Sequence, residues 1–184
     1  MKRLSAFVHR IAKSWVVLLS LVLFVLTTAV LFPFFADLLH VPEEAESIDT
    51  QFFYSPDRLY EIISAYDAQG RRGYALSHLT ADLIFPLVYT FLFSTAISFT
   101  FRRAFPVDSP LQRLNLMPFG LMAADLIENT LLVALLLSFP KRLNSLAMAA
   151  GVVTAVKWLF SAAAVLLLFL GAAAWLGNAF RRKD

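Results

Sequence analysis

Four stretches of the chain are apolar for long enough to cross a lipid bilayer, and short polar stretches separate them. The apolar runs cover residues 15–35, 74–101, 115–139 and 145–178. A helix rises about 1.5 Å per residue, so roughly 20 residues span a hydrocarbon core of about 30 Å. The pattern therefore predicts an all-α, four-helix transmembrane bundle that forms a single domain over residues 1–184.

One sizeable polar segment, residues 36–73, separates the first two apolar runs. It holds eight acidic and three basic residues, which gives it a net charge of −5. The Ser-Pro-Asp sequence at 55–57 is typical of a helix start, because serine caps, proline fits the first turn and an acid suits the positive end of the dipole. We predict a short amphipathic helix over about 56–69, ended by Gly70, that lies on the membrane surface or caps the bundle. Its apolar face consists of Leu59, Ile62, Ile63 and Tyr66.

The distribution of basic residues predicts the orientation in the membrane. The two terminal tails and the 102–113 loop hold ten of the 16 Lys and Arg residues, whereas the 36–73 segment and the hairpin at 140–144 hold five. Cytoplasmic loops are enriched in Lys and Arg, so we expect both termini inside and the 36–73 segment outside. The chain has a net charge of +3, but its basic residues flank the apolar runs. We therefore interpret the positive charge as a signal for orientation in the membrane. The expected partner is therefore the lipid bilayer and no nucleic acid.

Composition excludes several kinds of chemistry. The chain is 59% hydrophobic and 16% charged, whereas about a quarter of the residues in a soluble domain are charged. It has no cysteine, which excludes disulfides, thiolate nucleophiles, Cys-ligated zinc and dithiol redox relays. It also lacks a phosphate-binding loop, a nucleophile elbow and an HExxH zinc motif. No cofactor is evident from the sequence.

The second apolar run carries a polar stripe. Tyr74, His78, Asp82, Phe85 and Tyr89 recur at helical spacing and so share one face. Ionisable side chains inside a membrane helix are unfavourable and usually functional. Pro86 has no N–H group, so the backbone carbonyl of Asp82, four residues earlier, loses its helical donor. Asp82 therefore offers two kinds of acceptor at one place.

The third and fourth runs supply partners for this stripe. Asp125, Glu128 and Asn129 share a face because they are spaced at i, i+3 and i+4, and Lys157 lies in the fourth run. The helical rise places Glu128 and Lys157 near the middle of the bilayer. We expect Lys157 to pair with Asp125 or with Glu128, and both choices stay open. Two acids and one lysine leave one negative charge, which a proton, a cation or a cationic ligand would cancel.

Several functional hypotheses use these residues. His78 and Asp82, at i and i+4, would form a metal or cation site together with Glu128. Alternatively, Glu128 and Lys157 would exchange protons with a lipid-soluble substrate. Arg71 and Arg72 would then hold a lipid headgroup phosphate, unless they only extend toward the membrane surface.

Two sequence motifs carry a resemblance to a known family. GRRGY at 70–74 precedes Asp82, the Phe-Pro pair at 85–86 and Tyr89, and ADLIEN follows at 124–129. From Tyr54 to Asn129 this pattern resembles an uncharacterised family of bacterial four-helix integral membrane proteins. The resemblance implies a location in the bacterial inner membrane and brings no activity with it.

The sequence favours a multi-pass membrane protein whose polar pocket opens outward and binds a cation, an amphiphilic small molecule or a lipid. The alternative is an intramembrane enzyme that performs acid–base chemistry on a lipid or isoprenoid, so catalysis stays undecided. A third hypothesis is an accessory subunit, in which the charged cluster pairs helices with a second copy or with a partner membrane protein. The predicted pocket residues are Tyr74, His78, Asp82, Tyr89, Asp125, Glu128, Asn129 and Lys157.

Overall fold

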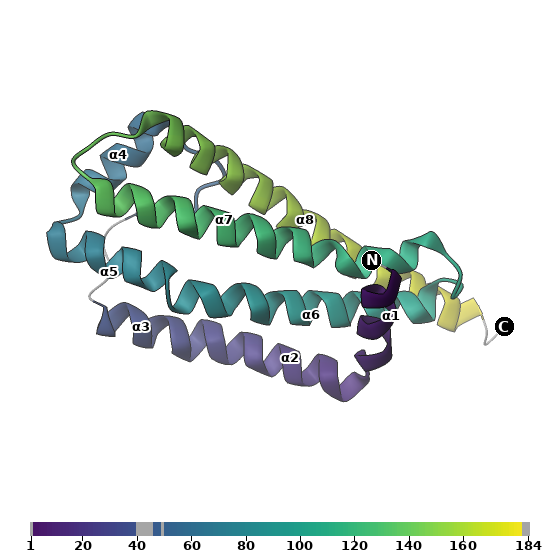
Figure 1. Ribbon diagram of the computed structural model, residues 1–184. Coiled ribbons are helices and arrows are strands. Elements are labelled where there is room, and N and C mark those ends of the chain that lie inside the picture. The colour runs from purple at the N-terminus through teal and green to yellow at the C-terminus, as the bar shows by residue number, and fades with distance from the viewer. Residues whose placement is uncertain (1, 40–45, 49, 182–184) are drawn as a thin grey trace.

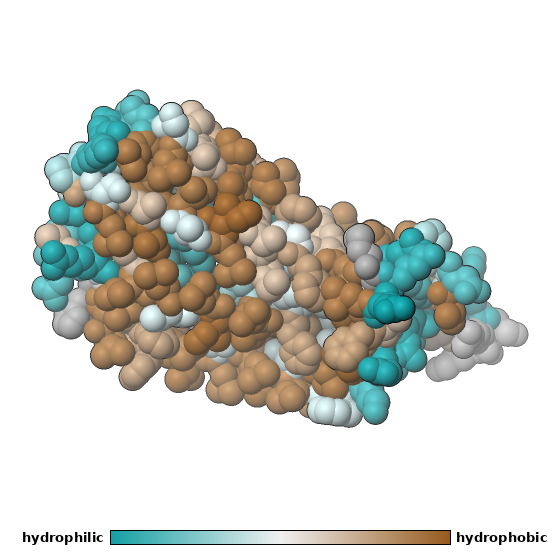
Figure 2. Space-filling view, in the orientation of Figure 1, coloured by the Kyte–Doolittle hydropathy of each residue, from teal (hydrophilic) through white to brown (hydrophobic). Residues whose placement is uncertain are grey.

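The fold is built from long helices that run side by side along a common axis, with shorter helices at the two ends of the bundle (Figure 1). The computed structural model describes residues 2–39, 46–48 and 50–181, and this part of the chain contains helices and no strand. The all-α architecture with four candidate membrane spans is confirmed. On the face shown in Figure 2, hydrophobic residues cover the middle and polar residues gather at both ends. The spans are Ser14–Leu38, Ala68–Ala104, Pro110–Ser138 and Asn144–Arg181.

The first span contains an irregular stretch ahead of its proline. Pro33 cannot donate a backbone hydrogen bond, so the helical ladder is interrupted one turn earlier. The hydroxyl of Thr27 donates to the backbone carbonyl of Leu23 at 2.8 Å, as expected for a threonine in this helix. The span consists of α2 (Ser14–Leu26), the π-helical turn η1 (Thr27–Leu31) and α3 (Phe32–Leu38).

The second span begins earlier than predicted. It consists of α5 (Ala68–His78) and α6 (Ala81–Ala104), so its start lies six residues before Tyr74. The side chain of Asp67 caps α5 by accepting the N–H of Gly70 at 2.7 Å. Gly70 therefore lies inside the first turn of α5, and its prediction as a helix stop is wrong.

The second span is also interrupted, at Leu79 and Thr80. The N–H groups of these two residues turn back to carbonyls three residues earlier, each at 3.1 Å. Pro86 lies beyond this break, inside α6. The interruption therefore precedes the proline by more than one turn, and α6 continues past Pro86.

The two remaining spans form the other side of the bundle. The 3₁₀ helix η2 (Pro110–Leu116) leads into α7 (Met117–Ser138), and α8 (Asn144–Arg181) follows a short turn. α8 packs along α7 and α6, and α2 packs along α6. With 38 residues, α8 is about 57 Å long, which exceeds the roughly 30 Å of a hydrocarbon core.

The helix α4 (Pro56–Ala65) packs over one end of the bundle (Figure 1). Ser55 caps it by accepting the N–H of Arg58 at 3.3 Å, and Tyr66 and Asp67 separate it from α5. The predicted helix over 56–69 is thus four residues shorter. Its apolar face is buried against α7 and α8 and is not available to a membrane surface. The core at this end includes Leu59, Ile62, Ile63, Tyr66, Leu132, Leu135, Leu136, Ala147 and Ala150.

The basic N-terminal segment forms a helix, α1 (Lys2–Ile11), that the sequence analysis did not predict. It crosses the end of the bundle opposite α4, where α8 also ends (Figure 1). Ser5 fixes it there, because the Ser5 hydroxyl donates to Asn115 Oδ1 at 2.8 Å while Asn115 Nδ2 donates to the Ser5 carbonyl at 3.1 Å.

Candidate functional site

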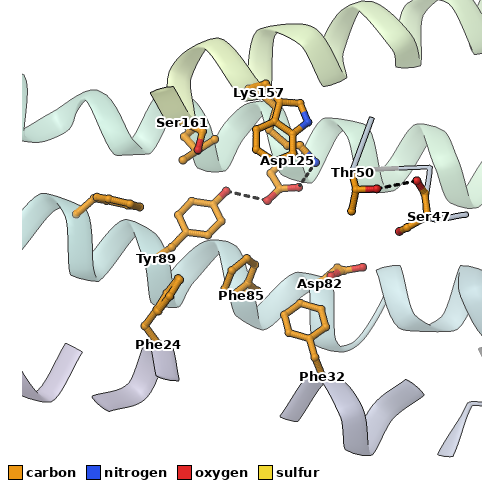
Figure 3. A pocket seen from close by; sticks show the side chains of 13 residues that line it. Phe24, Phe32, Ser47, Thr50, Asp82, Phe85, Tyr89, Asp125, Lys157 and Ser161 are labelled. Atoms are coloured by element: carbon orange, nitrogen blue, oxygen red, sulfur yellow. Dashed lines mark hydrogen bonds and ion pairs between the residues drawn. The ribbon is translucent and has the colours of Figure 1, made fainter. Parts of the chain in front are cut away.

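A cavity of about 520 Å³ lies between the first span and the α7–α8 pair (Figure 3). Four of the predicted pocket residues line it, one or two from each of α6, α7 and α8. The other four lie behind them: three contact a lining residue directly, and Tyr74 contacts His78. The lining residues are Asp82, Tyr89, Asp125 and Lys157, and the supporting ones are Tyr74, His78, Glu128 and Asn129.

The charged cluster joins α6, α7 and α8. Lys157 Nζ forms a close ion pair with Glu128 Oε2 and lies 3.8 Å from Asp125 Oδ1. The hydroxyl of Tyr89 donates to Asp125 Oδ2 at 2.8 Å. The open choice for Lys157 is thereby decided: it contacts both acids but binds Glu128 more closely. Tyr89 pairs with Asp125.

Burial separates the roles of the two acids in this cluster. The Glu128 side chain is fully buried, whereas Asp125 is 14% exposed and lines the cavity. Thr154 donates to Glu128 Oε1 at 2.5 Å, so Glu128 is held by a hydroxyl and an ammonium group. The formal charge of Asp125, Glu128 and Lys157 together is −1. Because Lys157 binds Glu128 more closely, this excess charge is concentrated on the carboxylate that faces the cavity.

A second polar group connects α5 with α6 and α7. His78 Nδ1 lies 2.9 Å from Asp82 Oδ2 and 3.1 Å from Asn129 Oδ1. Asn129 Nδ2 donates to the backbone carbonyl of Asp82 at 2.8 Å. This is the carbonyl that Pro86 leaves without a helical donor. The sequence predicted the free carbonyl but not the side chain that satisfies it.

Tyr74 supports the site from outside the cavity. Its ring lies 4.7 Å from that of His78, and its hydroxyl accepts the backbone N–H of Ile48 at 3.0 Å. The same hydroxyl bonds with the side chain of Ser47 at 3.0 Å. Tyr74 therefore ties the segment before α4 to the site, and Ser47 and Thr50 of that segment line the cavity.

Aromatic side chains form much of the wall, and the sequence analysis placed Phe85 on the polar stripe but missed Phe24 and Phe32. Phe85 lies between Phe24 and Phe32 of the first span, with ring centroids 5.6 and 5.1 Å away. Figure 3 shows Phe24 and Phe32 across the cavity from Asp125 and Lys157. Aromatic faces attract cations. Carboxylates and aromatic rings together favour an organic cation with an apolar body.

The predicted metal set is not assembled. His78 and Asp82 meet as their spacing predicted, but Glu128 is turned toward Lys157 and Thr154. Within residues 2–39, 46–48 and 50–181, no three His, Asp or Glu side chains are close enough to share a metal ion. The described side chains therefore do not form the three-ligand arrangement, and a cation site at His78 and Asp82 stays a prediction.

Arg71 and Arg72 do not line the cavity. Arg71 donates to the backbone carbonyl of Tyr66, and its guanidinium lies 4.5 Å from the centre of the Phe139 ring. Arg72 is exposed. Arg71 therefore joins α5 to the chain ahead of it and to the end of α7, and its predicted role with a lipid headgroup stays a prediction.

Comparisons of the chain with protein-family models, with curated proteins and with solved structures found no match. The chemistry of the cavity is therefore the basis for assigning a function.

Proposed function

We propose that the cavity binds an amphiphilic small molecule or lipid that carries a positive charge. The chain would do so as a multi-pass protein of the bacterial inner membrane, with both termini in the cytoplasm. The distribution of Lys and Arg supports this orientation, and the family resemblance supports the location. In this orientation α4 and the 36–73 segment lie on the extracytoplasmic side.

The observation that carries the proposal is the position of Asp125. One of its oxygens accepts from Tyr89, the other is 3.8 Å from Lys157, and the residue lines an aromatic cavity. Charge is poorly screened in apolar surroundings, so the excess charge of −1 attracts a compensating cation. An organic cation would neutralise Asp125 while its apolar part contacts Phe24 and Phe32.

The dimensions of the cavity support a small organic ligand. Its volume of about 520 Å³ falls within the roughly 300–1,000 Å³ of small-molecule sites. A smaller hollow of about 160 Å³ shares Phe32, Ser47 and Asp82 with it and extends between α3 and α5. Asp82 thus stands where the two spaces meet, and we propose that the ligand enters on this side.

One arrangement favours the alternative of an intramembrane enzyme. Four polar side chains form a continuous chain of contacts, in the order Tyr89, Asp125, Lys157 and Glu128. The first three also line the cavity. Such a series can pass a proton to or from a bound substrate. The accessory-subunit hypothesis needs only a closed contact between helices, so the cavity gives it less support.

Tetraphenylphosphonium tests the proposal, because it is a lipophilic cation that can be followed by equilibrium dialysis against the detergent-solubilised protein. Asp125→Asn keeps the ion pair between Lys157 and Glu128, whose charges cancel each other. The variant should therefore fold. We expect it to bind the cation at least about tenfold more weakly, equivalent to about 1.4 kcal/mol. Asp37→Asn is the matched control, since Asp37 is exposed and does not line the cavity.

Tetraphenylborate, which has the same shape and the opposite charge, separates binding from partitioning into the detergent. The proposal requires that the protein binds tetraphenylborate much more weakly than tetraphenylphosphonium. It also requires that tetraphenylborate does not displace the bound cation. Unchanged phosphonium affinity in Asp125→Asn would show that Asp125 does not hold the ligand.

A further inference from the structure

A second, basic hollow lies at the opposite end of the bundle from α4. Its volume is about 550 Å³, and residues of α1, α6, η2 and the loop before η2 line it. Three lysine or arginine side chains reach it from three different elements: Lys2, Arg102 and Arg113. One acid, Asp108, also lines it. None of these residues lines the cavity that contains Asp125.

The basic hollow is held in place by buried hydrogen bonds. Ser5, Gln112 and Asn115 are at most 7% exposed and join α1 to η2. Arg102 donates to the backbone carbonyl of His9 at 2.6 Å, which joins α6 to α1. The charged side chains therefore project from elements whose relative positions are fixed.

Burial disfavours a positive charge on His9, which also lines this hollow. Its Nε2 lies 2.9 Å from the backbone carbonyl of Gln112. Burial is the largest influence on the imidazole and lowers the pKa of His9 below its usual value. The fixed charges that line the hollow are then Lys2, Arg102, Arg113 and Asp108, with a sum of +2.

The two faces of α1 place this hollow at the level of lipid phosphates. Leu4 and Phe7, on the other face, are 44% and 47% exposed. They border an apolar groove of about 250 Å³ that continues along α6 and α7. A helix with one basic and one apolar face lies where acyl chains meet headgroups. The basic face of α1 therefore meets the headgroup layer.

We propose that the basic hollow binds the phosphate of an anionic phospholipid through Lys2, Arg102 and Arg113. A neighbouring hollow of about 520 Å³ shares Arg102 and is also lined by Arg103 and Arg181. The pair of hollows offers places for two phosphates near one arginine. A lipid with two phosphates, such as diphosphatidylglycerol, should therefore bind more tightly than phosphatidylglycerol, and neutral phosphatidylcholine should bind least.

Native mass spectrometry of the full chain with added diphosphatidylglycerol measures this binding directly. A basic side chain near an anionic membrane surface contributes about 1 kcal/mol, so Lys2→Gln and Arg113→Gln should each weaken binding about fivefold. Asp108→Asn should strengthen binding, because it removes the one acid among the lining residues. Arg102 is left unchanged because it also holds α1 through the His9 carbonyl.

Arg10→Gln is the matched control. Arg10 belongs to the same helix and lies 5.4 Å from the Phe7 ring centre, but it does not line the hollow. If Arg10→Gln weakens binding as much as Lys2→Gln, the attraction is a diffuse surface effect and the proposal is wrong. The proposal is also wrong if phosphatidylcholine binds as tightly as diphosphatidylglycerol. The same holds if inorganic phosphate displaces diphosphatidylglycerol at a similar concentration.

Discussion

Replacing Asn129 with leucine should destabilise the protein less when Pro86 is also replaced by alanine. Asn129 Nδ2 donates to the Asp82 carbonyl, which has no helical donor because residue 86 is proline. Alanine at position 86 restores a backbone N–H four residues after Asp82. In the Pro86→Ala variant the backbone N–H of residue 86 donates to the Asp82 carbonyl within α6. The hydrogen bond from the Asn129 amide is then no longer needed to satisfy this carbonyl.

The size of the effect follows from the two bonds that Asn129 makes. Hydrogen bonds between membrane helices contribute about 0.6 kcal/mol on average and up to about 1.7 kcal/mol. The donor to Asp82 and the acceptor for His78, at 2.8 and 3.1 Å, should together contribute about 2 kcal/mol. Pro86→Ala can replace only the first, so we expect a coupling energy of about 1 kcal/mol.

A double-mutant cycle measures this coupling. The wild type, both single variants and the double variant are unfolded reversibly by sodium dodecyl sulfate in mixed micelles, and the free energies of unfolding are compared. Pro86→Ala alone accounts for any change that proline removal makes to α6. Pro118→Ala serves as the control, because Pro118 lies in the first turn of α7, where no helical donor is missing.

Additivity would refute the reasoning. If Asn129→Leu destabilises both backgrounds equally, within about 0.5 kcal/mol, then Asn129 does not replace the missing N–H of Pro86. The same conclusion follows if Pro118→Ala shows as much coupling with Asn129→Leu as Pro86→Ala does.

Two further substitutions test the packing around the site by the same unfolding assay. Lys157→Met should lower the free energy of unfolding by about 3–5 kcal/mol, because it removes the cation from buried Glu128. Adding Glu128→Gln should recover part of this loss; no recovery would contradict the ion pair. Gly151→Ala should cost about 1–3 kcal/mol, since its Cβ would overlap the Tyr54 carbonyl. Gly177→Ala, with open space around it, should not destabilise; a loss equal to that of Gly151→Ala would contradict the close contact.

The four spans and the charged cluster could be predicted because they depend on local spacing. An apolar run of 20 residues is required by bilayer thickness whatever its neighbours are. Asp125 and Glu128 share a face through the helical period, and a buried lysine needs a carboxylate. These arguments brought Lys157 to the correct pair of acids, but the closer partner depends on side-chain geometry between helices.

The start of the second span could not be predicted because a glycine is compatible both with the end of one helix and with the first turn of the next. Gly70 fits a helix end, yet it also fits a first turn whose N–H is capped by Asp67. The choice depends on the packing of α4 and α5 against α7. The helix α1 was missed for a related reason, since its position depends on a bond between Ser5 and Asn115, which are 110 positions apart.

The three-ligand metal set is not assembled in the described residues for a similar reason. The spacing of His78 and Asp82 is a property of one helix, and the pair forms. The third ligand had to come from α7, where Glu128 has a stronger partner in Lys157 and a hydrogen bond from Thr154. A list of residue types at one depth does not say which of them are already paired.

The packing of α4 over the bundle also determines the order in which the molecule can be assembled. The hydroxyl of Tyr54 is hydrogen-bonded at 3.2 Å to that of Thr154 in α8, a hundred positions later in the chain. During synthesis, the segment containing Tyr54 must therefore wait, with the apolar face of α4 still lacking its cover from α8, until the last span has been made and inserted. The first three spans can enter the membrane early, but that end of the bundle closes only after the fourth.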